Sequence, residues 1–431
     1  MNAPDPRSKP ACYREDALAV VRALRDAGHI AYFAGGCVRD LLLGLEPKDY
    51  DVATDAVPEK VRSLFRNTQA VGQAFGVILV RLGRSVIEVA TFRSDGRYLD
   101  GRRPSEVHFT TAEEDAKRRD FTINGLFLDP IEDRVLDFVG GREDLEKKIL
   151  RAIGEPEARF EEDHLRLMRA VRFAARFDLD IEPKTQAAIR RHAPQLARIS
   201  PERVGDEARL MLTPATRVAA WEHLSDLGLL PVVMRFLPGA PPSPRPSPAS
   251  LFRRVAPGES IGFGLALAAL TLDYRLDPVK PDWIALLAPA ETHRSVQACR
   301  KALKISNDES NAMAGALDVL PLLHPELPSL ALLKRFLARP TSGDARYLLD
   351  AMHEVDPALT RMIWLREQFA ALEKTDCAPA PWVTGDDLTA SGMSPGPLFK
   401  RVLDAVYDAQ LEGRVHSKST ALELALELAR E

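Results

Sequence analysis

Two aspartates separated by one residue, Asp49 and Asp51, are the first feature of this sequence that could do chemistry. Residues 49–54 are rich in strand-forming types, and in a strand residues i and i+2 point to the same face. The two carboxylates would then lie close together, where they repel each other unless a cation sits between them. Divalent cations such as Mg²⁺ prefer such oxygen ligands. An isolated pair of this spacing is more often a solvated turn, so its neighbours decide between the two interpretations.

The segment directly upstream, GGCVRD at residues 35–40, has features of a phosphate-binding turn. Glycines Gly35 and Gly36 let backbone N–H groups approach a phosphate closely, and the N-terminus of a following helix favours anions. Arg39 supplies a cation that could bond to a phosphate oxygen. Gly-Gly turns are common, so this segment supports the metal-site interpretation without establishing it.

Two downstream segments supply further polar groups. Glu88 lies within the otherwise apolar segment VIEVA and is either a third carboxylate beside the aspartates or an outward-facing residue on an edge strand. The segment KRRDFTIN, residues 117–124, provides Arg119, Asp120 and Asn124, which can bind a triphosphate, a ribose hydroxyl and the local backbone. Its alternative is a polar turn that enters a buried segment.

The segment from 161 to 176 has helical spacing and carries a basic stripe. Asp163 is expected one turn before the first arginine. Such a stripe is usually a solvated face or a set of ion pairs. The arginines recur every three or four residues and so share one face of the predicted helix: Arg166, Arg169, Arg172 and Arg176.

The elements that must position these groups follow from residue periodicity. Helical patterns dominate from about Gly141 to the C-terminus, and the proline-rich segment 238–248 is expected to be an exposed loop or linker. Before Gly141 the patterns alternate, with strands predicted at 30–36, 49–54, 77–82 and 85–92 and helices at 14–28, 38–44 and 57–65.

Taken in order, these motifs resemble the class II nucleotidyltransferases, the family of tRNA CCA-adding enzymes and bacterial poly(A) polymerases. The resemblance spans residues 30–212. It implies an α+β fold, with a polymerase-beta-like nucleotidyltransferase head built on a mixed sheet and followed by helical domains. The expected divisions are a catalytic head at 1–142, a neck at 143–212, a tRNA-binding body at 213–370 and a tail at 371–431.

The resemblance also implies a reaction, the attack of an RNA 3′-hydroxyl on the α-phosphate of a nucleoside triphosphate. Asp49 and Asp51 would hold two Mg²⁺ ions, with Glu88 beside the one that activates the primer, and these three are the predicted catalytic residues. Residues 94–104 correspond to a flexible loop that helps the family change from C to A addition. The predicted nucleotide-binding residues are Gly35, Gly36, Arg39, Arg119, Asp120, Asn124, Asp163, Arg166, Arg169 and Arg172.

In this family the residues matching Asp163 and Arg166 hydrogen-bond the Watson–Crick edge of the incoming base, so the protein is the template. This role suits the chemistry of the side chains, because a carboxylate accepts a hydrogen bond from the exocyclic amine of cytosine or adenine. Uracil and guanine present a carbonyl at that place and would face an unfavourable acceptor.

The expected product is therefore CCA at the 3′ end of tRNA, made from CTP and ATP with recognition of the acceptor arm. A poly(A) polymerase is the alternative, but such enzymes typically end in a basic tail, and residues 211–431 hold 23 basic and 26 acidic side chains. The segments VTGDDL at 383–388 and SPGP at 394–397 are similar to the C-terminal region of short CCA-adding enzymes. A CC-only or A-only enzyme shares most of the motifs and stays open.

Two hypotheses from other classes also remain. A catalytically inactive RNA-binding homologue would be favoured by loss of one of the three carboxylates, all of which are present. A nucleotidyltransferase acting on small molecules would need neither the 161–176 segment nor a large helical body. The arginine pairs at 190–191 and 253–254 are candidate contacts to tRNA.

The length, composition and charge of the chain argue against several other classes of protein. The 431 residues predict several domains, and a net charge of −4 gives no overall basicity. The four cysteines are scattered without a CxxC pair, so neither a zinc site nor a disulfide framework is indicated. The longest apolar run, near 261–272, is shorter than the ~20 residues that span a bilayer. We therefore expect a cytoplasmic protein with no membrane partner.

Overall fold

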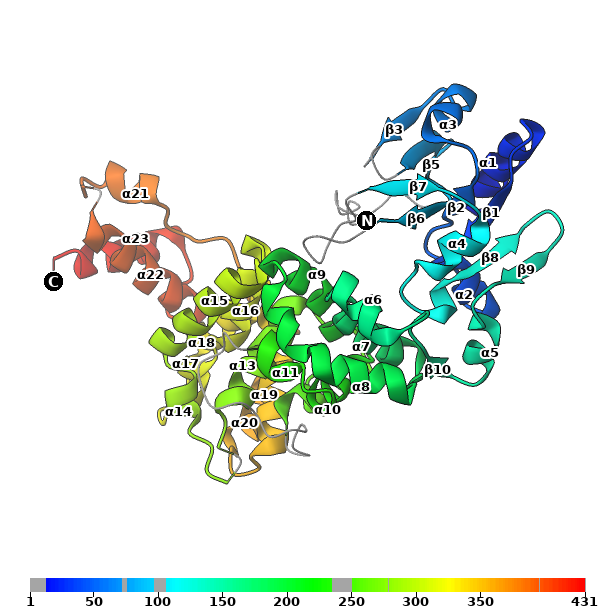
Figure 1. Cartoon of the computed structure of the whole chain (residues 1–431). Coiled ribbons are helices and arrows are strands. Elements are labelled where there is room, and N and C mark those ends of the chain that lie inside the picture. Colours follow the sequence, from blue (N-terminus) through cyan, green and yellow to red (C-terminus); the bar gives the residue numbers. More distant parts are fainter. Residues whose placement is uncertain are drawn as a thin grey trace. The chain divides into compact units, whose positions relative to one another are not determined.

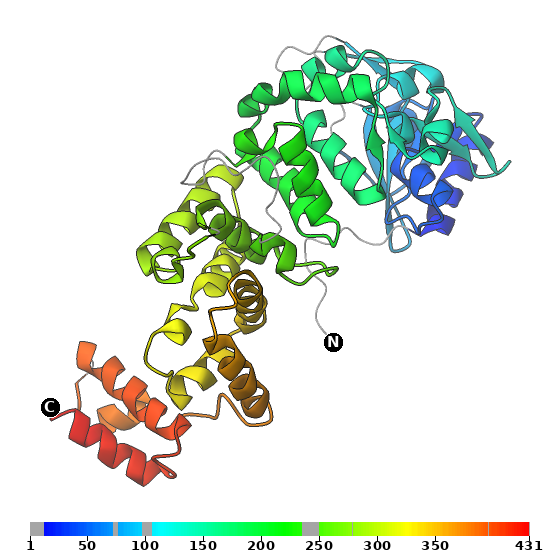
Figure 2. The same ribbon diagram turned by 90° about the horizontal axis from the view of Figure 1, so that it is seen from below.

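The computed structural model describes residues 13–71, 76–96, 106–234, 250–277, 279–394 and 396–430. It divides into two compact units, Met1–Met211 with Ala219–Val233 and Leu212–Val218 with Met234–Glu431. Figures 1 and 2 show the chain coloured from blue at the N-terminus to red at the C-terminus. The predicted linker at 238–248 and most of the predicted loop at 94–104 lie outside the described residues.

A seven-stranded mixed sheet forms the core of the first unit, with the strand order β3-β4-β5-β2-β1-β8-β9. Strands β2 and β5 pair in parallel and the other neighbours are antiparallel. The strands are β1 Ala31–Ala34, β2 Val52–Thr54, β3 Thr68–Ala70, β4 Val77–Leu82, β5 Ser85–Thr91, β8 Leu126–Asp129 and β9 Arg134–Asp137.

The parallel pair places two of the predicted catalytic residues side by side. Val52 on β2 is in register with Val89 on β5, so Asp51 directly precedes β2 beside Glu88. Because β5 is the third of seven strands, the edge-strand alternative for Glu88 is wrong. The expected strand at 49–54 is shorter than predicted, since β2 begins only at Val52.

Helices and an aromatic cluster hold the sheet in shape. Helix α1 (Arg14–Asp26) buries one apolar face against β1 and β2, and α3 (Pro58–Leu64) contacts β4 and β5. Phe92 and Phe127 meet edge to face at 5.9 Å, and both also lie close to Tyr32. Between β5 and β8 in the chain, β6 (Arg93–Asp95) and β7 (Val107–Phe109) pair as a short antiparallel hairpin.

The remainder of this unit is mostly helical, apart from the short parallel pair of β10 (Ile149–Leu150) and β11 (Asp180–Ile181). The helices of this unit beyond α1 and α3 are α2 Gly36–Leu42, α4 Ala112–Lys117, η2 Thr122–Asn124, α5 Gly141–Glu146, α6 Pro156–Glu162, α7 Arg166–Phe177, α8 Pro183–His192, η3 Ala193–Arg198, α9 Pro201–Leu212, α10 Arg217–Asp226 and α11 Leu230–Val233.

One predicted helix is wrong in its extent. The sequence predicts a continuous helix over 161–176, but α6 ends at Glu162 and α7 begins at Arg166. Asp163 has an extended backbone with φ −148° and ψ 104°. Its carboxylate accepts a hydrogen bond from the N–H of Leu165 at 3.0 Å, a local bond that competes with helical pairing.

Every element described in the second unit is helical. The segment VTGDDL starts α21 with a capping box in which Thr384 and Asp387 bond to each other's backbone N–H. The helices are α12 Leu251–Arg254, α13 Phe263–Arg275, α14 Trp283–Leu286, α15 Pro289–Leu303, α16 Asn307–Leu317, α17 Leu320–Leu323, α18 Leu330–Leu337, α19 Ser342–Val355, α20 Arg361–Leu372, α21 Gly385–Ala390, α22 Pro397–Leu411 and α23 Lys418–Leu428.

The α+β fold class is confirmed, with a mixed sheet in the N-terminal part and helices after it. The four-part division of the chain stays a prediction. Within the described residues, no helix is long and apolar enough to cross a membrane.

We predict that Phe92→Ala destabilises the first unit by about 3–5 kcal/mol, because it removes a fully buried ring from the aromatic cluster. Chemical denaturation measures the change in the free energy of unfolding. Ile131→Ala, at a side chain that is 48% exposed, is the control and should shift this free energy by less than about 0.5 kcal/mol. Equal effects of the two substitutions would contradict this account of the core.

Candidate active site

A pocket of about 1000 Å³ lies in the first unit, between the sheet and α7. Eight arginines and five carboxylate residues line it, so its lining carries an excess of positive charge suited to a polyanion such as a triphosphate. All but one of the predicted site residues line it: Gly35, Gly36, Arg39, Asp51, Glu88, Arg119, Asp120, Asn124, Asp163, Arg166, Arg169 and Arg172. The exception is Asp49.

The aspartate pair keeps the alternation expected of a strand, although it precedes β2. Tyr50 is 6% exposed and packs its ring 5.3 Å from that of Phe33, while Asp49 and Asp51 on either side are half-buried. The backbone carbonyl of Asp51 accepts from the N–H of Ala34 at 3.0 Å, which ties this segment to the end of β1. Burying the tyrosine therefore orients both carboxylates away from the core.

The neighbouring thiol of Cys37 does not compete as a metal ligand. Burial, together with the negative charges of Asp51 and Asp49, raises the pKa of Cys37 to about 12. The thiol is therefore protonated at neutral pH, whereas metal binding requires the thiolate.

The carboxylates of the site suit a Mg²⁺ ion whose remaining ligands come from the substrate and water. Among the described residues, no three His, Cys, Asp or Glu side chains gather closely enough to hold a metal ion by themselves. Mg²⁺ is commonly bound by one or two carboxylates together with substrate phosphates and water. Half-buried Asp49 and Asp51, with Glu88 on the adjacent strand, fit that mode of binding and would not fit an all-protein cage.

The glycine turn at the start of α2 is required by its surroundings. Gly35 has φ +71°, and a Cβ there would lie 2.6 Å from Nη1 of Arg119. The Arg119 guanidinium also donates to the carbonyl of Asn124 at 3.3 Å. Glycine at position 35 thus allows an arginine to lie directly against the turn.

Arg39 lines the pocket but is also held by the protein. Its side chain is buried and donates through Nε and Nη2 to Oδ1 of Asp40 at 2.8 and 2.6 Å. A third donor, Nη1, bonds to Oδ1 of Asn124 at 2.6 Å. The guanidinium lies 4.3 Å from the ring centroid of Phe177. These contacts fix its position between α2, η2 and α7.

Asp120 is a buried hub and bonds to protein groups through both of its oxygens. Oδ1 accepts from the N–H of Phe121 and from Asn124, and Oδ2 accepts from Nε of Arg169 at 2.9 Å. Burial opposes ionisation of this carboxyl, but the charge of Arg169 and the bond from Asn124 outweigh it and lower the pKa of Asp120 to about 2. The side chain predicted to contact ribose thus joins α7 to η2.

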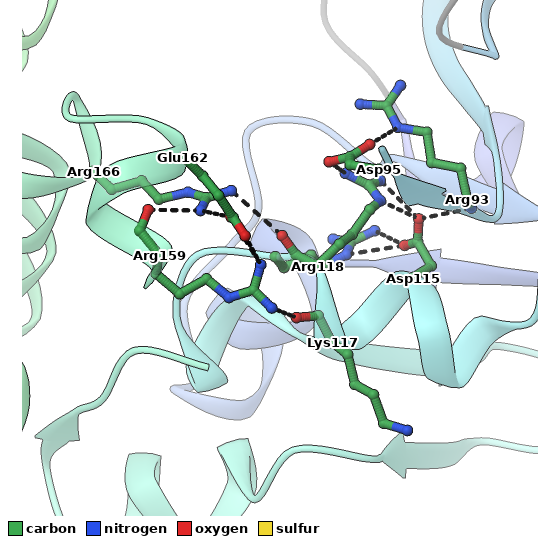
Figure 3. A network of polar contacts seen from close by, with 9 residues as sticks. Arg93, Asp95, Asp115, Lys117, Arg118, Arg159, Glu162 and Arg166 are labelled. Carbon is green, nitrogen blue, oxygen red and sulfur yellow. Dashed lines mark hydrogen bonds and ion pairs between the residues drawn. The ribbon is translucent and has the colours of Figure 1, made fainter. Parts of the chain in front are cut away.

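A second buried carboxylate, Asp115 on α4, holds two pocket arginines. Its oxygens accept from Nε of Arg118 at 2.8 Å and from Arg119 at 3.0 Å, and the backbone N–H of Arg93 also donates to it. Burial opposes ionisation, but the two arginines hold the pKa of Asp115 below its usual value. Figure 3 shows this network, which also includes Asp95 on the β6–β7 hairpin.

Arg166 belongs to the same region of the pocket wall (Figure 3). Its Nη1 donates to Oε2 of Glu162 at 2.5 Å and to the carbonyl of Arg159 at 2.9 Å. Its Nη2 lies 3.4 Å from the carbonyl of Arg118. Arg159 pairs with the same glutamate, so Glu162 connects α6 to the start of α7.

The other arginines of the stripe lie on one face of α7, as their spacing predicts. Arg169, Arg172 and Arg176 line the pocket, whereas the opposite face is buried in the core through Leu167, Val171 and Ala174.

Comparison with known proteins agrees with this geometry. Residues 31–151 match the model of the poly A polymerase head domain, and residues 178–239 match a probable RNA and SrmB-binding site of polymerase A. The chain is 35% identical to the CCA-adding enzyme of Geobacillus kaustophilus, over 94% of each chain. It is 40% identical to poly(A) polymerase I of Salmonella typhi, but over 54% of each chain.

The chain belongs to the class II nucleotidyltransferase family. Among solved structures, the Bacillus stearothermophilus CCA-adding enzyme in complex with CTP matches with a TM-score of 0.68 and 30% identity, covering 95% of this chain and 96% of that one. Membership of this family of enzymes confirms the resemblance inferred from the motifs.

Several pocket residues of this nucleotidyltransferase were not among the predicted site residues: Arg93, Asp95, Arg118, Phe173 and Arg176. Arg176 belongs to the recognised stripe and Arg118 precedes Arg119, so spacing could have indicated both. Arg93 and Asp95 lie on the β6–β7 hairpin, which the sequence patterns did not predict. Arg93 and Asp95 line the pocket because that hairpin packs against α4.

We expect Gly35→Ala to weaken nucleoside triphosphate binding, because the new Cβ must displace Arg119. Gly28→Ala is the matched control, since Gly28 also has positive φ, at +87°, but nothing lies within 4 Å of the added Cβ. Both variants should lose about 1 kcal/mol or more of stability from backbone strain. Calorimetric titration with CTP should show weaker binding only for Gly35→Ala, and equal affinities for both variants would contradict the proposed packing.

The depressed pKa of Asp120 predicts a pH-dependent contribution to stability. A carboxyl whose pKa falls from 3.8 to about 2 on folding stabilises the fold above pH 4, and this stabilisation is lost as the pH falls through about 2. The difference in unfolding free energy between wild type and Asp120→Asn should therefore shrink by about 2 kcal/mol between pH 5 and pH 2. Urea titrations across that pH range measure this difference. A difference that stays constant with pH would show that Asp120 is not a charged, paired carboxylate in the folded protein.

Proposed function

We propose that this chain adds CCA to the 3′ end of tRNA from CTP and ATP and releases pyrophosphate. The observation that carries the proposal is one pocket that holds carboxylates suited to metal-assisted nucleotidyl transfer, Asp51 and Glu88, together with a base-selecting pair, Asp163 and Arg166. Similarity to CCA-adding enzymes over 94% of the chain supports this product, since similarity to poly(A) polymerase I is limited to 54%.

The catalytic carboxylates have distinct proposed roles. Asp49 and Asp51 would hold two Mg²⁺ ions, and Glu88 would lie beside the ion nearer the RNA primer. When bound, the ions would lower the pKa of the attacking 3′-hydroxyl and stabilise the leaving oxygen. The protein's own task is to align the primer oxygen, the α-phosphate and the pyrophosphate group, because nucleotidyl transfer depends mainly on positioning and charge neutralisation.

The triphosphate would be held by the basic side of the pocket. The backbone N–H of Gly36 and the guanidinium groups of Arg119 and Arg39 would supply donors and positive charge at the glycine turn. Arg169 and Arg172 on α7 contribute two more cations. Because Asp120 is saturated by protein bonds, we propose that it acts on the nucleotide by orienting Arg169 and Asn124.

Base selection would depend on the segment between α6 and α7. The Asp163 carboxylate can only accept, which suits the amine of cytosine or adenine, and Arg166 can donate to a ring nitrogen or carbonyl. Both side chains line the pocket at the end of α6 and the start of α7.

The remaining assignments extend from this function. We propose that residues 1–142 form the catalytic head, 143–212 the neck, 213–370 a body that binds the tRNA acceptor arm, and 371–431 a helical tail. The protein would act in the cytoplasm. Arg191 pairs with Glu157 and Arg254 lies 3.5 Å from Glu354. Both pairs are partly exposed, so these arginines could exchange a carboxylate for an RNA phosphate.

A tRNA that lacks its terminal CCA tests the product directly. Given Mg²⁺ with both CTP and ATP, extension should stop after three nucleotides, whereas CTP alone should give only partial extension. A poly(A) polymerase would instead extend indefinitely with ATP alone. A CC-only enzyme would add the two cytidines without the final adenosine, and an A-only enzyme would not add the cytidines.

In the same assay, Asp51→Asn should reduce incorporation by roughly a hundredfold or more, because charge stabilisation through the metal contributes several kcal/mol. Asp133→Asn is the matched control, since Asp133 is exposed in the turn between β8 and β9 and asparagine tolerates its φ of 50°. Near-full incorporation by a folded Asp51→Asn protein that still binds tRNA would overturn the catalytic assignment.

A further inference from the structure

Helix α9 carries two oppositely charged side chains, Arg203 and Glu207, four residues apart and therefore on the same face. Neither residue is among those that line the pocket. Glu207 is buried, with 6% of its surface exposed, and Arg203 is half-buried. Both side chains contact residues of the pocket wall from behind, so they can affect the nucleotide only through those residues.

Arg203 binds the predicted base-selecting carboxylate. Its Nη2 donates to Oδ2 of Asp163 at 2.7 Å, while Oδ1 of Asp163 accepts from the N–H of Leu165 at 3.0 Å. Asp163 lies in the non-helical break between α6 and α7. One hydrogen bond on each oxygen sets the carboxylate plane, and each oxygen keeps capacity to accept from a base.

Glu207 performs the equivalent task for the arginines of α7. Its Oε2 accepts from Nε of Arg172 at 2.7 Å, and its Oε1 lies 3.7 Å from Nη1 of Arg169. Arg172 also lies 4.3 Å from the ring centroid of Phe173, so its guanidinium is held on two sides. A buried, paired carboxylate of this kind restricts the positions that the two guanidinium groups can adopt.

We infer that α9 is a positioning helix for nucleotide selection, in which Arg203 orients the Asp163 carboxylate toward the base and Glu207 orients Arg172 and Arg169 toward the remainder of the nucleotide. The inference rests on the proposed function, because it assigns Asp163 to the base edge. It adds two residues that contact no substrate and yet determine different properties of the reaction.

The two residues predict separable effects. Disorienting Asp163 removes the acceptor that distinguishes cytosine and adenine from uracil, so selectivity falls. Disorienting Arg172 and Arg169 weakens contacts that every nucleoside triphosphate shares, so all substrates lose affinity together. A residue that served only to stabilise the fold would not separate selectivity from affinity in this way.

The experiment measures kcat and KM for CTP and UTP on a tRNA that lacks CCA, for wild type, Arg203→Gln and Glu207→Gln. For Arg203→Gln, the ratio of kcat/KM for CTP to that for UTP should fall by about tenfold or more, the scale of one hydrogen bond between charged groups. For Glu207→Gln, KM should rise for both nucleotides and the ratio should stay within about twofold of wild type.

Two further variants complete the design. Arg203→Lys keeps a charge but not the planar fork of donors, so it should restore part of the lost selectivity. It also provides a testable protein if Arg203→Gln does not fold. Glu202→Gln, an exposed residue on the same helix, should match wild type in both parameters.

An unchanged CTP-to-UTP ratio in folded Arg203→Gln and Arg203→Lys would overturn the role of Arg203, as would an equal loss for both nucleotides. A changed ratio in Glu207→Gln would overturn the division of roles. Failure of the wild-type protein to prefer CTP over UTP would instead refute the proposed function, so the two failures are distinguishable.

Discussion

A single buried charge, the carboxylate of Asp120, connects the two halves of the site. It accepts from Arg169 on α7 and from Asn124 in η2, and Asn124 accepts in turn from Arg39 on α2. Arg39 then bonds to Asp40. A buried carboxylate is costly unless it is fully paired, so this network favours one arrangement in which the sheet end and α7 are both in place. The catalytic and selecting residues therefore depend on the same interaction.

The charges of the pocket are divided by element. Carboxylates suited to metal binding lie where β2 and β5 run in parallel, and arginines extend along one face of α7. Three buried carboxylates each pair with a pocket arginine: Asp115 with Arg119, Asp120 with Arg169 and Glu207 with Arg172. Such pairing fixes long, flexible side chains before the nucleotide arrives, which lowers the entropic cost of binding.

Much of this site could be predicted from the sequence, because local patterns determine it. The positions of Asp49 and Asp51 around the buried Tyr50, the glycine turn at Gly35 and the arginine spacing on α7 all depend on residues close in the chain. The apolar neighbours of Glu88 also predict the strand that contains it. Its place in the middle of the sheet could not be known, since strand order depends on pairing between distant segments.

The features that local patterns do not predict also depend on contacts between distant segments. The break at Asp163 interrupts an otherwise helical pattern, because a side-chain bond to Leu165 and an ion pair with Arg203 from another helix replace helical pairing. Arg93 and Asp95 enter the pocket through packing of the β6–β7 hairpin on α4. Glu207 lies 35 residues from Arg172, and no local pattern connects the two.

The central claim is that the protein itself, without an RNA template, selects the base. Equilibrium titration of the wild-type protein with each of the four nucleoside triphosphates, in Mg²⁺ and without RNA, tests it most directly. The account predicts that CTP and ATP bind at least about tenfold more tightly than UTP and GTP, the discrimination expected of one good pair of base-edge contacts. Equal affinity for all four nucleotides would contradict it.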